Sequence, residues 1–251
     1  MSLDIALSLV YIVLSAAIVA AMASKRIFLI SPYFFAYLCF EFVAAVAGLA
    51  VYDCTGLSIW YWCFFLAWLA GNCLLYFYVL AEIGKNLLCS NGKSLPRWSL
   101  AVLLFAAASL LVLILARWTD APGRSPLANL CFVGMRADGA LEFAGFLALV
   151  SWSNFRKLHW PQRELHIATG CGFLTFAAFL MSILLFQWNT GPAYYGIYEA
   201  GQAADLIVLA YWLRYFWIVD RGLPARRRIK AEPESRKSHD DREPTQYANN
   251  A

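Results

Sequence analysis

Long apolar runs, separated by short connections rich in charged residues, constrain this chain more than any other feature. A run of about 20 apolar residues matches an α-helix that crosses a hydrocarbon core of about 30 Å. With 61% hydrophobic residues, 14% charged residues and a mean hydropathy of +0.58, the chain is too apolar for a soluble domain. The runs also lack the polar alternation of a membrane β-barrel strand. The sequence therefore predicts an all-α membrane protein.

Seven such runs predict a seven-transmembrane-helix bundle over residues 1–221. Five prolines agree with this division, because each falls in a connection or at a helix start, where a missing N–H costs nothing: Pro32, Pro96, Pro126, Pro161 and Pro192. None lies inside a run, whereas transporters with broken helices often show paired Pro or Gly interruptions. The predicted helices are about 4–23, 29–52, 57–82, 98–116, 127–152, 165–187 and 195–219.

The distribution of basic residues predicts the orientation. The fourth connection holds Arg117 and Arg124, and the second and sixth hold no basic residue. By the positive-inside rule, the odd connections are cytoplasmic, the N-terminus is outside and the C-terminus is cytoplasmic. We thus expect a multi-pass protein of the cell (cytoplasmic or inner) membrane. The odd connections hold eight basic residues: Lys25, Arg26, Lys85, Lys93, Arg97, Arg156, Lys157 and Arg163.

The two ends of the chain call for separate predictions. Ala21-Met22-Ala23 resembles a signal-peptidase site, but no positive segment precedes the first run, so we expect it to be retained. Residues 222–251 are rich in proline and in charges of both signs, which predicts a disordered cytoplasmic tail. Its basic residues Arg226, Arg227, Arg228 and Lys230 are expected to contact lipid headgroups.

The bilayer is the expected partner, and a cytoplasmic protein that binds the inner loops and tail is a further candidate. No nucleic-acid partner is expected, and the oligomeric state stays open.

Ionisable residues inside the predicted spans form the candidate site. Such residues are costly in lipid, tend to face the bundle interior and tend to pair. Glu41, Arg136 and Asp205 each lie about ten residues from the predicted outer helix end, so Arg136 is expected to pair with Glu41 or Asp205. The candidate intramembrane polar cluster is Glu41, Arg136, Asp138, Glu142 and Asp205, with Asn72, Glu199 and Gln202 as further members.

One arginine cannot neutralise four acids. Some of the acids must therefore be protonated, hydrated or paired with a ligand cation. Two interpretations remain open from the sequence. The cluster is either an outward-facing polar pocket, with or without a link to protons, or a structural network that fixes helix packing.

Other chemistry finds no support in the motifs. There is no Schiff-base lysine in the last run, no G-x-S-x-G and no H-E-x-x-H, so no catalytic residue and no cofactor are predicted. His159 and His166 have Glu164 between them, but their spacing is not expected to put both rings on one helical face, and no metal site is predicted. Cys54 and Cys131 are the two cysteines on the predicted outer side, and a disulfide between them is one open alternative.

Short motifs resemble those of an uncharacterised bacterial seven-helix integral membrane protein family. They are Phe34-Phe35-Ala36-Tyr37-Leu38 with Glu41-Phe42, then Val79-Leu80-Ala81-Glu82-Ile83, then Arg136 with Glu142. The resemblance spans residues 30–217 and implies the same seven-helix topology, but it implies no activity. The chain departs from the family pattern at Asn72, where an acidic or small residue would be expected.

Three functions follow as hypotheses. The first is a small-ligand sensor or accessory membrane protein, which combines a polar pocket with a basic cytoplasmic face. The second is a proton- or ion-coupled small-molecule carrier, which the excess of buried acids favours and the unbroken helices oppose. The third is a lipid-acting membrane enzyme.

Overall fold

A computed structural model describes residues 3–56, 58–92, 126–187 and 192–218 of the chain. Within these ranges it has six long helices and one short 3-10 turn, η1, at Ile27–Leu29. The long helices are α1 (Leu3–Ser24), α2 (Pro32–Thr55), α3 (Ile59–Ser90), α5 (Pro126–Phe155), α6 (Gln162–Gln187) and α7 (Pro192–Ile218).

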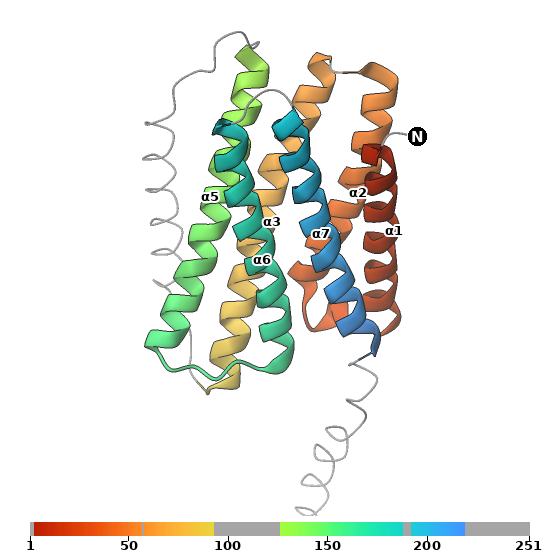
Figure 1. Ribbon diagram of the computed structural model, residues 1–251. Coiled ribbons are helices and arrows are strands. Elements are labelled where there is room, and N and C mark those ends of the chain that lie inside the picture. Colours follow the sequence, from red (N-terminus) through yellow and green to blue (C-terminus); the bar gives the residue numbers. More distant parts are fainter. Residues whose placement is uncertain (1–2, 57, 93–125, 188–191, 219–251) are drawn as a thin grey trace, which may run out of the picture.

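The six described helices pack as a closed ring (Figure 1). Each helix contacts its neighbour in the order α1, α2, α3, α5, α6 and α7, and α7 returns to α1. A smaller contact between α3 and α6 crosses the ring. Helices α1, α3, α5 and α7 run in one direction, and α2 and α6 run in the other. The interior of this ring is therefore shared by all six helices.

Prolines begin three of these helices. Pro32, Pro126 and Pro192 are the first residues of α2, α5 and α7, and Pro161 directly precedes α6. The fixed backbone angle of proline suits a first helical position, which has no intrahelical hydrogen bond to lose. The sequence prediction that prolines mark helix starts is confirmed for these four.

The outer surface of the ring is apolar. Large aliphatic side chains are more than half exposed on four helices: Val13 (66%), Val43 (61%), Leu74 (59%) and Ile207 (61%). Exposed apolar surface of this extent is rare on a soluble monomer and is expected where a helix meets lipid. Four helices are long and apolar enough to cross a membrane, namely Ala6–Ser24, Pro32–Cys54, Ile59–Ser90 and Gln162–Leu185. The chain is a helical membrane protein.

The helices differ from the prediction mainly at their ends. Helix α3 continues to Ser90, beyond the predicted end at residue 82, because Ile83, Leu87 and Leu88 are buried against the other helices. The turn η1 was not expected. The predicted span at 98–116 and the tail at 222–251, with Arg226, Arg227, Arg228 and Lys230, lie outside the described residues.

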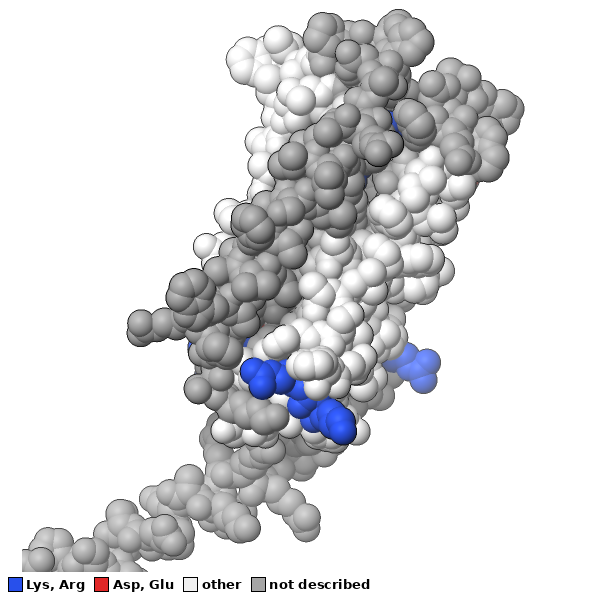
Figure 2. Space-filling view, turned by 90° about the vertical axis from the view of Figure 1, so that its left-hand side faces the viewer, with Lys and Arg blue, Asp and Glu red and all other residues white. Residues whose placement is uncertain are grey.

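Basic side chains gather at one end of the ring, where α1, α3, α5 and α7 end and α2 and α6 begin. In Figure 2 the Lys and Arg side chains that are clearly in view lie toward this end. We call it the basic end. Its described residues are Lys25, Arg26, Lys85, Arg156, Lys157, Arg163 and Arg214.

Candidate functional site

A cavity of about 190 Å³ lies inside the ring, and residues of all six described helices line it. Its polar lining comes chiefly from acids in the central turns of the helices. Four of the five charged residues predicted for the polar cluster are in this lining: Glu41, Asp138, Glu142 and Asp205. Asn72, predicted as a further member, also lines the cavity.

Two aromatic donors hold Glu41 of α2. The Tyr11 hydroxyl of α1 donates to Oε2 at 3.2 Å, and the Trp68 indole N–H of α3 donates to Oε1 at 3.1 Å. Such a hydrogen bond contributes about 0.5–1.5 kcal/mol when the acceptor is neutral and about 1.5–3 kcal/mol when it is charged. Both donors also line the cavity. Neither was predicted from the sequence, because tyrosine and tryptophan in an apolar run are indistinguishable there from packing residues.

A single amide serves two acids. The Asn72 Nδ2 of α3 donates to Asp138 Oδ2 at 3.2 Å and to Glu142 Oε1 at 2.8 Å. The two acids are four residues apart on α5, and this spacing places them on one helical face. All three side chains are at least nine-tenths buried, with exposed fractions of 8%, 9% and 6%. Asn72 thus uses both of its N–H groups to hold the acid pair.

Other carboxyl oxygens in the cavity have fewer hydrogen-bond donors. Asp138 Oδ1 is buried and has no conventional N–H or O–H donor among the described residues; the neighbouring Cys73 thiol is only a weak donor. Asp205 of α7 lines the cavity and accepts no hydrogen bond from any described residue. A buried carboxylate without a partner costs several kcal/mol. The cavity therefore has acceptor capacity that the described side chains do not fill.

Arg136 lies on another side of α5. The residues of α5 in the cavity lining are Met135, Asp138, Gly139 and Glu142, which form one helical stripe. Arg136 is two residues from Asp138, about 200° around the helix, and it is buried outside this lining. The pairing of Arg136 with Glu41 or Asp205 stays a prediction, and Arg136 itself is not part of the cavity lining that contains these two acids.

The three predicted cluster members on α7, which are spaced three residues apart, also differ in whether they line the cavity. Asp205 lines the cavity, whereas Glu199 and Gln202 do not. Gln202 Oε1 is buried without a hydrogen-bond partner among the described residues. Gly201, Leu209 and Trp212 complete the part of α7 that faces the cavity. A spacing of three residues drifts around the helix, so only one of the three reaches the interior.

Four aromatic rings contribute to the remaining wall, which otherwise consists mostly of small and aliphatic residues. Tyr11, Tyr37, Trp68 and Trp212 all line the cavity. Trp212 is fully buried, and its indole N–H donates to the His166 carbonyl at 3.3 Å. Its ring lies against Gly170 of α6, where any side chain would collide with it. Aromatic faces attract cations by about 0.5–2 kcal/mol, so this wall and the acids favour the same sign of ligand charge.

The acids are not arranged as a metal site. Within the described ranges, no three His, Cys, Asp or Glu side chains converge closely enough to hold a metal ion. Cys54 and Cys131, the pair for which a disulfide was left open, are both free thiols. The carboxylates come from three helices around the cavity, an arrangement suited to a ligand larger than a single ion.

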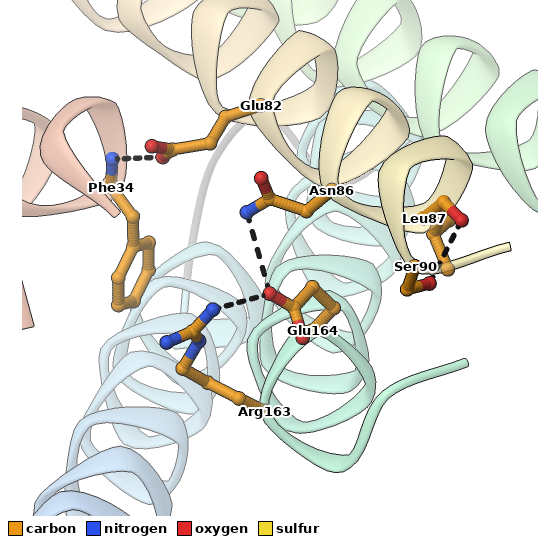
Figure 3. Close-up of polar contacts among 7 residues, drawn as sticks. All are labelled: Phe34, Glu82, Asn86, Leu87, Ser90, Arg163 and Glu164. Atoms are coloured by element: carbon orange, nitrogen blue, oxygen red, sulfur yellow. Dashed lines mark hydrogen bonds and ion pairs between the residues drawn. The ribbon is translucent and has the colours of Figure 1, made fainter. Parts of the chain in front are cut away.

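A second polar group lies at the basic end and is shown in Figure 3. Glu82 of α3 is buried and accepts a hydrogen bond from the backbone N–H of Phe34 at 3.0 Å, in the first turn of α2. Glu164 Oε1 accepts from Asn86 at 3.3 Å and pairs with Arg163 at 2.7 Å. The acids of this group are bound to donors of the protein itself, which is the pattern of a structural network.

Lys25 completes the basic end. Its amino group donates to the backbone carbonyl of Phe216, and to that of Trp217 at 3.3 Å. These carbonyls belong to the last turn of α7, which has no intrahelical donors for them. Glu82 and Lys25 therefore cap a helix start and a helix end from neighbouring helices.

Comparison of the chain with protein-family models, with curated proteins and with solved structures gives no match.

Proposed function

We propose that this protein binds a small organic cation of the primary ammonium class in the cavity between its helices, and acts as a multi-pass membrane sensor or accessory protein. One observation carries the proposal. Four acids line one cavity, and no lysine, arginine or histidine occurs among the described residues that line it. A ligand cation would supply the charge that the wall lacks.

The wall chemistry narrows the ligand further. An ammonium N–H can donate to Asp138 Oδ1 and to Asp205, which lack conventional donors among the described residues. The rings of Tyr37 and Trp212 can contact its positive charge. A cavity of about 190 Å³ is smaller than the roughly 300–1,000 Å³ of drug-sized sites, so the part of the ligand inside it is small.

A binding measurement tests the proposal. Radiolabelled methylammonium should bind saturably to the full chain in lipid nanodiscs, and tetramethylammonium, which has no N–H, should compete more weakly. Binding should weaken as the pH is lowered, because protonation of the acids removes their attraction for a cation. Absence of saturable methylammonium binding, at constant ionic strength with sodium chloride, would contradict the proposal.

The proposed topology has seven helices, with the basic end in the cytoplasm. The common direction of α3 and α5 supports a further span at 98–116, because an odd number of spans between them would preserve that direction. The basic residues at one end support the orientation. The resemblance to the bacterial seven-helix family belongs to the same proposal.

Two exposed cysteines test the orientation. Cys54 lies near the end of α2, opposite the basic end, and Cys89 lies near the end of α3, at the basic end. In intact cells, a membrane-impermeant maleimide should label a variant whose only cysteine is Cys54, and it should not label a Cys89-only variant until the cells are permeabilised. The reverse pattern would place the basic end outside.

A proton- or ion-coupled carrier is the second candidate, and the unneutralised acids favour it. The six described helices are continuous, without the broken segments common at transporter sites. Proteoliposomes loaded with a pH-sensitive dye distinguish the two functions. A carrier would show methylammonium-dependent flux that is lost in Glu41→Gln or Asp205→Asn, whereas a sensor would bind the cation without flux.

A further inference from the structure

A groove of about 480 Å³ opens between α6 and α7 on the side away from the cavity. Its lining is almost entirely apolar and consists of small and aliphatic residues. Leu180 and Leu184 come from α6, and Gly196, Ile197 and Ala200 come from α7. Leu180 and Ala200 are exposed, so the groove faces outward, where lipid would surround the ring.

The groove and the cavity share part of their walls. Ala177, Met181 and Gly201 line both of them. The Met181 side chain lies directly against Gly201, where a β-carbon would collide with its sulfur. Methionine is unbranched and can change its rotamer at small cost. The Met181 side chain, packed against Gly201, therefore lies between the acidic cavity and the apolar groove.

These two spaces together fit one class of molecule. The cavity offers acids, among them Asp138 Oδ1, which has no N–H or O–H donor among the described residues, and these suit an ammonium group. The groove offers mainly apolar surface, which suits an aliphatic chain. We infer that the ligand is a membrane-dissolved primary amine with an aliphatic chain, and that its ammonium group lies in the cavity while its chain passes Met181 into the groove between α6 and α7.

The size of the cavity gives a reason for the chain to leave it. At about 190 Å³, the cavity is smaller than the roughly 300–1,000 Å³ of sites that enclose a drug-sized ligand, and a long-chain amine would extend beyond it. Its chain would then extend outward past Met181 and Gly201, which line both the cavity and the groove.

The inference rests on the proposed function, and its test separates the two. The probe is n-decylamine with a photoreactive diazirine at the end of the chain, bound to the full protein in nanodiscs. Illumination followed by peptide mapping should place the label on groove residues, such as Leu180, Leu184 and Ile197. Excess methylammonium should abolish this labelling, because the two molecules compete for the acids. Labelling by probe that is merely dissolved in the lipid should be the same with and without methylammonium.

Two alanine variants of α7 provide the matched control. Ala200 and Ala203 are both exposed, but only Ala200 lines the groove. Ala200→Phe should fill the groove and weaken n-octylamine binding on the order of tenfold or more, while methylammonium binding stays within twofold. Ala203→Phe should leave both unchanged. If Ala200→Phe binds neither amine, the variant is misfolded, and its thermal unfolding profile should show this. The milder variant Ala200→Leu is then measured in its place.

Several outcomes would overturn the inference. If methylammonium binds but the competed label lies on other helices, or if properly folded Ala200→Phe and Ala200→Leu both bind n-octylamine as the unchanged protein does, the chain does not use this groove. If Ala200→Phe changes the oligomeric state in light scattering, the groove is covered by a second copy. If methylammonium itself does not bind, the proposed function fails first.

Discussion

The acids of the central cavity and the acids of the basic end have the same side-chain chemistry but different partners. At the basic end, Glu82 accepts from a backbone N–H and Glu164 accepts from Asn86 and Arg163. In the cavity, Asp138 and Glu142 share one amide, and Asp205 accepts from no described residue. Acids that the protein satisfies by itself stabilise the fold, whereas acids left short of donors are available to a ligand.

The position along the helix explains this difference. The first turn of a helix has backbone N–H groups without intrahelical partners, and Glu82 uses one from α2. In the middle of a helix every backbone N–H is already bonded to a carbonyl four residues earlier. Central acids can therefore be satisfied only by side chains or by a ligand. The following changes should separate the two regions, beginning with the largest effect.

Replacement of the two neighbouring carboxyl groups on α5 should have the largest effect on methylammonium binding. In the double variant Asp138→Asn, Glu142→Gln, methylammonium affinity should fall on the order of 100-fold, or about 2.7 kcal/mol. The folded state should not be destabilised, because buried charges are replaced by amides of the same shape. Equilibrium binding and thermal unfolding in nanodiscs measure both quantities. The matched control is Glu82→Gln at the basic end. An equal loss of methylammonium affinity in this variant would contradict the assignment of binding to the cavity acids and of structure to the acids of the basic end.

Loss of the Glu82 carboxylate should affect stability and not binding. In Glu82→Ala the backbone N–H of Phe34 loses its acceptor, which should lower the free energy of unfolding by about 1–3 kcal/mol. Methylammonium affinity should stay within twofold. Denaturant titration in detergent measures the stability. Lys85→Ala, at an exposed position three residues along α3, should change neither quantity by a comparable amount.

Asn72 should be more important than Asn86, although each donates to an acid. Asn72→Leu leaves Asp138 and Glu142 without their shared donor and should lower the free energy of unfolding by about 1–2 kcal/mol. Saturating methylammonium should restore part of this loss. In Asn86→Leu the carboxylate of Glu164 keeps Arg163, so the loss should be below about 1 kcal/mol. Equal losses would mean that the cavity acids have other donors.

The Lys25 cap should give the smallest effect. Lys25→Met removes a cation from the last turn of α7, which should cost about 0.3–1 kcal/mol and should be less evident at high salt. Arg26→Met, at the exposed neighbouring position, is the control. A loss of methylammonium binding in Lys25→Met would show that the two regions are coupled.

Much of the candidate site could be predicted from residue type. Acids inside apolar runs are costly, so Glu41, Asp138, Glu142 and Asp205 were expected to turn inward, and all four line the cavity. The Tyr11 and Trp68 donors could not be predicted, because aromatic residues are common on every face of an apolar helix. Glu82 as a cap of α2 could not be predicted either, since it joins residues 48 positions apart.

By itself the sequence determined that the chain is helical and apolar enough for a membrane, that prolines begin its helices and that acids lie within its spans. These features follow from local composition and spacing. The tertiary structure decided that the described helices form a ring, that Asn72 holds two acids, and that Arg136 lies outside the cavity lining. The physical reason is that the rotation of each helix about its axis depends on packing against its neighbours. That rotation, rather than depth in the sequence, selects the side chains that meet.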